Sequence, residues 1–404
     1  MTRPSRVAVC GPLAEFAAGF TTELAGLGYS PPTIEAQLRF MRHVSGWLAA
    51  QGLSAGELTV EVVGRFVVER RAVSSNLRSE RALVPLLGFL RGQGVAPAPP
   101  TASPAGPVEV LAGRFARYLC LQRGLGPATV RSYASQVQPF LAWHAQYHGG
   151  RWETLTAGHV AQFTVARAAG QRPRSVQVGL NALRALLRWL WLEGVTPAPL
   201  ADSVGPCAAT SPTSLPKALT SGQVSDLLAG LSADPLARLR DEAMLALMWR
   251  MGLRAGEVAS LRLDDIAWRV GVIVVHGKGD RRDQVPLPVD VGELLAAYLS
   301  RGRPAGGTHR NLFLALDAPH RPVGAGAVSS VVARAGVRAG IPGRCGAHRL
   351  RHTAACRVLA AGGGLVEAGQ LLRHTSTAAT AVYAKSDLLA LAVLARPWPG
   401  GAGR

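Results

Sequence analysis

Six side chains in the second half of the chain are suited to one kind of chemistry, and they occur in four short islands and one site beyond them. The islands are Gly252–Val258, Gly277–Gly279, His348–Thr353 and Leu371–His374, and a tyrosine follows nine residues after the last of them. The candidate catalytic residues are Arg254, Lys278, His348, Arg351, His374 and Tyr383. Each of these residue types is common, so the prediction depends on their joint occurrence in this order.

Together these residue types can break a phosphodiester by covalent catalysis. Attack on the phosphorus builds negative charge on the non-bridging oxygens, which Arg254 and Arg351 can bind through bidentate hydrogen bonds. A phenol, with a pKa of about 10, is a poor nucleophile until a base and nearby cations assist it. We therefore predict Tyr383 as the nucleophile, His348 as its base and His374 as a further donor to the phosphate.

Lys278 is the expected general acid. The leaving oxygen needs a proton, and an ammonium can supply one, whereas a guanidinium does not readily do so. The chain is rich in arginine and has only three lysines, Lys217, Lys278 and Lys385. A lysine in a turn between two expected strands therefore favours a chemical role.

Structural alternatives exist for all six residues. The arginines can be surface or backbone-binding residues, and Tyr383 can be a packed helix residue, although the third part of the chain has only one other tyrosine, Tyr298. We expect Glu257 to have a structural role within the first island, for example as the partner of an arginine. We expect His352 to support the fold or the pocket.

A zinc site is the competing interpretation of two of the histidines. His348 and His352 are four residues apart and would share a helix face, as zinc-binding histidines do. Position 349 is Arg, where a metalloprotease motif needs Glu, and no cluster of Cys, Asp or Glu completes a site. We expect no metal and no cofactor, and the chain has no phosphate-binding loop of the nucleotide-binding type.

The order of the four islands resembles the active-site pattern of the tyrosine recombinase, or phage integrase, family. That pattern is Arg, Lys on a β-hairpin, His-x-x-Arg, then His or Trp, then the nucleophilic Tyr. The resemblance implies strand exchange on double-stranded DNA through a 3′-phosphotyrosine intermediate, a homotetramer on paired sites, and the possibility of accessory recombination proteins. The C-terminal segments 383–387 and 396–400 resemble recombinases carried by plasmids and transposons.

The chain departs from this pattern at one position, because the family commonly has Gly before its second His and this chain has Arg373. A glycine there permits an unusual backbone angle or a close approach. Arg373 is then either tolerated at a helix end or an additional contact to phosphate.

Two proline-rich segments, Pro97–Pro107 and Pro197–Pro216, divide the chain into three parts. We expect a helical domain at 1–96, a linker at 97–107, a second helical domain at 108–199, a linker at 200–216 and a catalytic domain at 217–404. The expected fold is mainly α with a small β-sheet: helical SAM-like core-binding domains, as the resemblance implies, followed by a mixed α/β catalytic domain.

The first two parts are expected to be copies of each other. Short matches recur in the same order, and each copy ends in Gly-Val followed by Pro-Ala-Pro. The matched pairs are Gly28 with Gly124, Trp47 with Trp143, Leu58 with Leu155, Phe66 with Phe163 and Gly94 with Gly194. The apolar residues recur at helical spacing, which predicts two small bundles; the two stripes are Ile34, Leu38, Met41, Val44 and Leu48, and Leu180, Leu183, Leu186, Leu187 and Leu190.

In the third part, capping residues and periodicity predict helices near 221–231, 236–251, 291–299, 327–339, 347–361, 365–372 and 377–394, with a β-hairpin from strands 271–275 and 284–287.

Composition is consistent with a polyanionic partner. The chain has 404 residues and a formal net charge of +19, which favours nucleic acid. Five scattered cysteines without a C-x-x-C pair argue against a disulfide framework and for a reducing, cytoplasmic setting. No signal peptide and no membrane span are expected.

Two rival functions use related chemistry or the same fold. An enzyme similar to type IB topoisomerases would relax supercoils without exchanging partners, and a regulator would bind DNA without cutting it. The complete set of six residues argues against the regulator, and the duplicated helical domains argue against the topoisomerase.

Overall fold

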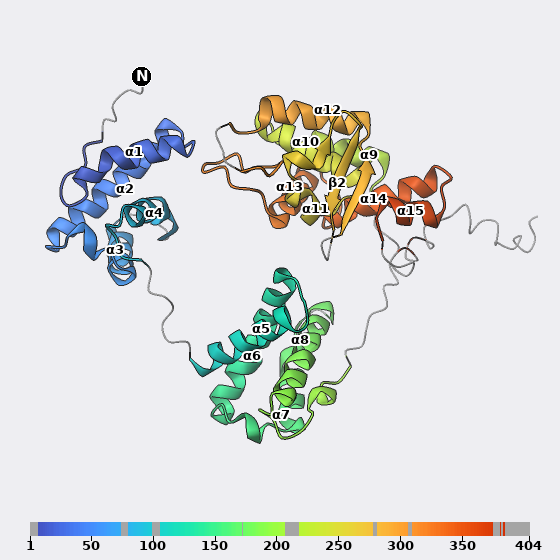
Figure 1. Cartoon of the computed structure of the whole chain (residues 1–404), viewed down its shortest axis with the longest axis horizontal. Coiled ribbons are helices and arrows are strands. Elements are labelled where there is room, and N and C mark those ends of the chain that lie inside the picture. The colour runs from blue at the N-terminus through green and yellow to red at the C-terminus, as the bar shows by residue number, and fades with distance from the viewer. Residues whose placement is uncertain are drawn as a thin grey trace, which may run out of the picture. The chain divides into compact units, whose positions relative to one another are not determined.

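The computed structural model describes residues 7–73, 80–98, 106–171, 173–206, 218–277, 281–305, 309–374, 380 and 383. It is mainly helical, with a three-stranded antiparallel sheet of order β1-β2-β3 (Figure 1), which confirms the expected fold class. Backbone contacts group residues 100–213 as one compact unit and the rest of the chain as another. Among the described helices, none has both the length and the apolar character that a membrane crossing needs.

The first part, in blue to cyan in Figure 1, is a small helical bundle with its own core. The predicted stripe from Ile34 to Leu48 is buried, with at most 8% exposure, so burial of the apolar helix face holds the bundle together. Its elements are the 3₁₀ turns Ala14–Phe16, Ala55–Glu57 and Glu80–Leu83 and the helices α1 (Ala17–Gly26), α2 (Pro31–Ala50), α3 (Val60–Val73) and α4 (Val84–Gly92).

The second part is likewise a helical bundle, with a separate core of its own. Within its stripe, Leu183, Leu186, Leu187 and Leu190 are buried, whereas Leu180 is only partly buried. Its elements are α5 (Pro107–Leu121), α6 (Pro127–His148), α7 (Ala157–Ala168), α8 (Pro173–Leu192) and the 3₁₀ turns Trp152–Thr154 and Ala201–Ser203.

Several matched residues of the two bundles have similar ring contacts or backbone angles. The rings of Trp47 and Phe66 lie 5.6 Å apart between centroids, and those of Trp143 and Phe163 lie 5.5 Å apart. The matched pair Gly94 and Gly194 both have left-handed backbone, with φ of +71° and +68°, a conformation that glycine adopts without steric cost. In both bundles a short 3₁₀ turn separates the second helix from the third.

The third part contains the predicted hairpin and the predicted helices as far as residue 372, and its main core extends from Leu219 to Leu350. Thr220 caps α9 by accepting a hydrogen bond from the Gln223 N–H at 3.2 Å. The elements are α9 (Ser221–Ala229), α10 (Pro235–Trp249), α11 (Ala255–Ser260), a 3₁₀ turn (Leu263–Asp265), β1 (Ile266–Ala267), β2 (Val272–His276), β3 (Arg282–Pro286), α12 (Val289–Ala297), a π-helical turn (Tyr298–Gly302), α13 (Ala325–Arg338), α14 (Ala347–Ala360) and α15 (Leu365–Leu371).

The hairpin pairs Ile273 with Val285 and His276 with Arg282 in antiparallel register. In β2, Ile273 and Val275 are fully buried, so the alternate residues of this strand attach the hairpin to the core. The Gly277 N–H donates to the Arg281 carbonyl at 2.7 Å, which fixes the two residues that flank the tip.

Two details differ from the sequence prediction, and a third expected element lies almost entirely outside the described residues. The short strand β1, which pairs with β2, was not predicted, because two residues show no periodicity. Leu231 lies beyond the end of α9, yet it is buried. Of the helix expected at 377–394, only residues 380 and 383 are among those described.

Candidate active site

The first island places Arg254 at the N-terminus of α11, where Glu257 binds it twice. The Arg254 N–H donates to Oε2 of Glu257 at 2.8 Å, and the guanidinium donates to Oε1 at 2.6 Å. Glu257 is buried, whereas the Arg254 side chain is 49% exposed. The expectation that Glu257 is an arginine partner is confirmed, and the Arg254 head remains accessible.

Arg351, in the second turn of α14, connects two islands through backbone carbonyls. Its guanidinium donates to the carbonyl oxygens of Gly252 and Leu372, and the residue is 2% exposed. Burial, followed by the charge of Arg254, lowers the pKa of Arg351 to about 10, so the group stays charged at pH 7. Two of its five N–H donors are thus committed to positioning the chain around the site.

Arg373 is the second residue after α15 and has a left-handed conformation, with φ of +52°. Its N–H donates to the Gln370 carbonyl and the His374 N–H donates to the Gly369 carbonyl, both at 3.0 Å. This is the Schellman arrangement, in which the left-handed position is usually glycine. An arginine there costs on the order of 1–3 kcal/mol of backbone strain, so the departure noted in the sequence falls where glycine is favoured.

The Arg373 side chain is 6% exposed and donates to Oε2 of Glu257 at 2.6 Å. It is thus an ion-pair partner within the site, a role that neither sequence interpretation of this residue included. Burial acts to raise the pKa of Glu257, but the Arg254 N–H and the charges of Arg373 and Arg254 outweigh it and lower that pKa. Glu257 is therefore ionised between two arginines.

His348 and His352 lie one turn apart at the start of α14. Their ring centroids are 4.3 Å apart, and His348 is exposed while His352 is partly buried. Burial, followed by the charges of His348 and Arg351, lowers the pKa of His352 to about 4. Within the described residues, no group of three or more His, Cys, Asp or Glu side chains has a geometry that could hold a metal ion.

His374 sits beside the arginines at the end of α15. Its Nδ1 is 2.8 Å from Oγ1 of Thr380. Burial, followed by the charges of Arg351 and Arg254, lowers the pKa of His374 to about 4. At pH 7 this ring is therefore neutral and carries one N–H.

The Tyr383 ring lies near the rings of His352 and His374. Its ring centroid is 5.2 Å from His352 and 6.4 Å from His374. The residue is 2% exposed and packs in a cluster with Leu359 and Leu372. Burial raises the pKa of Tyr383 to about 12, although the charge of Arg351 opposes this shift. The phenol is thus neutral and shielded in the DNA-free protein.

The structure therefore brings five of the six candidates together, and Lys278 lies outside the described residues. Sequence reasoning did not identify Thr380, which positions His374, or Asp283 of β3, which lies 4.0 Å from the guanidinium Nε of Arg373. A hydroxyl or carboxylate outside a motif gives no sequence signal, because its partner is set only by folding.

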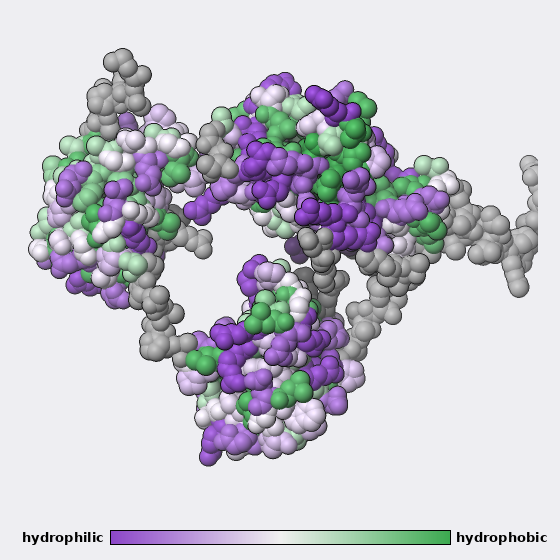
Figure 2. Space-filling view, in the orientation of Figure 1, coloured by the Kyte–Doolittle hydropathy of each residue, from purple (hydrophilic) through white to green (hydrophobic). Residues whose placement is uncertain are grey.

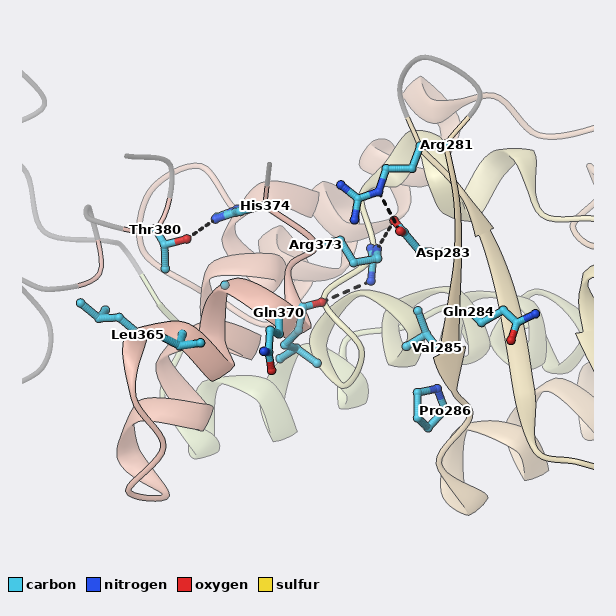
Figure 3. A pocket seen from close by; sticks show the side chains of 13 residues that line it. Arg281, Asp283, Gln284, Val285, Pro286, Leu365, Gln370, Arg373, His374 and Thr380 are labelled. Carbon is cyan, nitrogen blue, oxygen red and sulfur yellow. Dashed lines mark hydrogen bonds and ion pairs between the residues drawn. The ribbon is translucent and has the colours of Figure 1, made fainter. Parts of the chain in front are cut away.

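A pocket of about 840 Å³ opens between strand β3 and helix α15. Figure 3 shows Arg373 directed toward Asp283, and His374 directed away from it toward Thr380. The pocket has Val285 and Leu365 among its apolar lining residues, and its charged lining residues are Arg281, Asp283 and Arg373.

Two family models match parts of this chain, and named proteins match most of it. The phage integrase family matches residues 217–388, and the SAM-like N-terminal domain of phage integrases matches residues 112–194. A Sinorhizobium fredii protein, y4rA, whose name describes it as an inferred integrase/recombinase, is 35% identical over 97% of this chain and 96% of its own length. Tyrosine recombinase XerC of Yersinia pestis is 32% identical over 69% of this chain and 91% of its own.

Solved structures show the same fold at lower identity. The XerH site-specific recombinase bound to a palindromic difH substrate has a TM-score of 0.58 at 19% identity and covers 73% of this chain and 98% of its own. A lambda integrase dimer bound to a COC′ core site has a TM-score of 0.53 at 19% identity and covers 73% and 99%. This chain belongs to the phage integrase family of tyrosine recombinases and is a site-specific recombinase that acts on DNA.

Proposed function

We propose that this recombinase cleaves DNA by attack of Tyr383 on the scissile phosphate, forming a 3′-phosphotyrosine bond and releasing a 5′-hydroxyl. The 5′-hydroxyl of a partner strand then attacks the phosphotyrosine and restores a phosphodiester. The observation that carries this proposal is the convergence of Arg254, Arg351 and His374 beside Tyr383.

The proposed roles follow from charge and protonation. Arg254 and Arg351 bind the non-bridging oxygens, and His374 donates its N–H to the same phosphate. His348, exposed at the start of α14, takes the phenol proton, and Lys278 gives a proton to the leaving oxygen.

We further propose that the reaction needs no metal and no nucleotide. The energy of the broken phosphodiester is retained in the phosphotyrosine, so rejoining requires no other source. Cations of the protein supply the charge stabilisation that a metal would otherwise provide. The active assembly on paired double-stranded sites is proposed to be a homotetramer in the cytoplasm, with room for accessory recombination proteins.

Covalent trapping of the intact protein tests this function. A binding site is first selected from random duplex DNA and then made with a nick beside the scissile phosphate, so that the released fragment diffuses away. We expect a protein–DNA complex that survives denaturation and carries DNA on a tyrosine through its 3′ phosphate. Excess EDTA should leave its yield unchanged, whereas strong inhibition would require a metal.

Exchange between two labelled duplexes separates recombination from relaxation. Recombinant products are expected when both duplexes carry the site. Supercoil relaxation without such products would favour the topoisomerase, and binding without any covalent complex would favour the regulator.

We propose the domain boundaries 1–96, 108–199 and 217–404, with DNA contacts from both bundles. The second bundle is the more basic: residues 108–199 hold ten arginines and three glutamates, a net charge of +7, against ten and seven, or +3, in residues 1–96. Figure 2 shows hydrophilic residues over much of the visible face of α5–α8. We expect the first bundle to add a smaller number of phosphate contacts.

Removal of residues 1–104 tests the contribution of the first bundle. Each neutralised phosphate contributes about −0.9 to the slope of log affinity against log salt on duplex DNA. The truncated protein is therefore expected to bind more weakly, with a flatter slope and a shorter nuclease footprint. Covalent cleavage at high protein concentration should survive, because 108–404 retains the second bundle and the site.

The matched measurement is assembly of two sites by the truncated and the full-length protein. An unchanged footprint and salt slope together with failed assembly would assign the first bundle to protein contacts instead of DNA.

A further inference from the structure

Arg373 has a backbone conformation that residues other than glycine rarely adopt. It is the left-handed residue that closes the Schellman end of α15, directly before His374. A side chain at this position adds steric strain that glycine avoids. The strain is maintained only if interactions of the side chain or its surroundings offset it.

The guanidinium of Arg373 connects segments that are distant in sequence. It donates to Glu257 of α11 at 2.6 Å and to the Leu371 carbonyl at 3.2 Å, and its Nε lies 4.0 Å from Asp283 of β3. Asp283 also accepts a hydrogen bond from Arg281 at 2.8 Å. Arg373 thus links the Arg254 island and the returning strand of the hairpin to the residue before His374.

Glu257 is shared between two arginines that differ in accessibility. Its Oε1 accepts from the half-exposed Arg254, and its Oε2 accepts from the buried Arg373. For Arg254 to bind a phosphate through the same N–H groups, it must leave Oε1. A buried carboxylate without a counter-charge is strongly disfavoured, so this exchange requires that Glu257 keep another cation.

We propose that Arg373 is a positioning residue that supplies this cation. It keeps Glu257 neutralised while Arg254 transfers its guanidinium to the scissile phosphate, and it holds the end of α15 so that His374 faces the same phosphate. This inference rests on the proposed roles of Arg254 and His374. Arg373 itself does not contact the DNA.

The test uses Arg373→Asn and Arg373→Gly, which accept the left-handed backbone and lack the guanidinium. Single-turnover cleavage at saturating DNA is measured together with the equilibrium Kd. We expect the cleavage rate constant to fall about tenfold or more, because small misplacement of reacting groups is costly, while the Kd changes little. Arg373→Lys, which keeps one charge but cannot bridge, is expected to lie between these variants and the wild type.

A second variant distinguishes this role from general support of the fold. In Arg373→Asn, Glu257 retains only Arg254 and should hold it back from the phosphate. Adding Glu257→Gln removes that hold, so the double variant is expected to cleave faster than Arg373→Asn alone. A purely structural defect would instead become worse. His320→Gly is the matched backbone control. Among the described residues, His320 is the other non-glycine residue with a left-handed backbone, with φ of +52°. Its replacement by glycine relieves the same kind of backbone strain and should leave the cleavage rate normal.

Three outcomes would overturn the proposal. The first is an unchanged cleavage rate constant in Arg373→Asn or Arg373→Lys. The second is a weaker Kd with an unchanged rate constant, which would make Arg373 a DNA contact. The third is a double variant that cleaves more slowly than Arg373→Asn alone. If Arg373→Asn does not fold, Arg373→Lys decides on the same criteria. A wild-type protein that forms no covalent complex would contradict the proposed function itself.

Discussion

Tyr383→Phe is expected to abolish the covalent protein–DNA complex while the protein still binds its DNA site. The substitution removes one oxygen, the atom proposed to form the bond to phosphorus. Tyr383 is 2% exposed and its ring packs with Leu359 and Leu372, and phenylalanine preserves these contacts. Stability and DNA affinity should therefore change little, whereas trapping on the nicked substrate should fall to background.

Tyr298→Phe is the matched control, since it makes the same chemical change at a buried tyrosine of the same domain. The Tyr298 hydroxyl accepts a hydrogen bond from the Leu314 N–H at 3.2 Å, so its loss should cost about 1 kcal/mol of stability and leave cleavage intact. A normal yield of covalent complex from Tyr383→Phe, mapped to any other residue, would disprove the assignment of the nucleophile.

Lys278→Ala should slow cleavage of ordinary DNA by about 10²–10⁴-fold, the usual contribution of a general acid. The same variant should cleave DNA with a bridging sulfur at the 5′ leaving position at nearly the wild-type rate. A thiolate leaves without a proton, so the acid is no longer needed. The measurement is the single-turnover rate on the two substrates.

Lys278→Arg separates proton donation from charge. Arginine keeps a positive charge at this position but does not readily release a proton, so this variant should behave like Lys278→Ala on ordinary DNA and recover on the sulfur substrate. Equal slowing on both substrates, in either variant, would assign Lys278 to phosphate binding.

The sequence alone was sufficient for the fold class, the hairpin and most of the helices. Apolar periodicity predicted the buried stripe of α2, and capping chemistry predicted the start of α9 at Thr220. These are local properties, in which the spacing of side chains along a helix or strand fixes which face is buried. The short strand β1 was not predicted, because a strand of two residues is too short to show an alternation of apolar and polar side chains.

The order of residue types also predicted the six candidates, and the matched peptides predicted that the two helical bundles are copies of each other. Their roles remain predictions, but the structure brings Arg254, Arg351, His348, His374 and Tyr383 into one region. The order of the motifs predicts the site because each motif residue has a side chain suited to one step of phosphoryl transfer.

Only the tertiary structure decided how these residues are held. That Arg351 binds the Gly252 and Leu372 carbonyls, and that Glu257 is shared by Arg254 and Arg373, depends on contacts between segments about 20 to 120 residues apart. No local pattern encodes such pairs, because the partner of a buried charge is fixed by packing and not by its sequence neighbours. For the same reason the sequence showed that Arg373 was unusual, and the fold showed that it is a buried partner of Glu257.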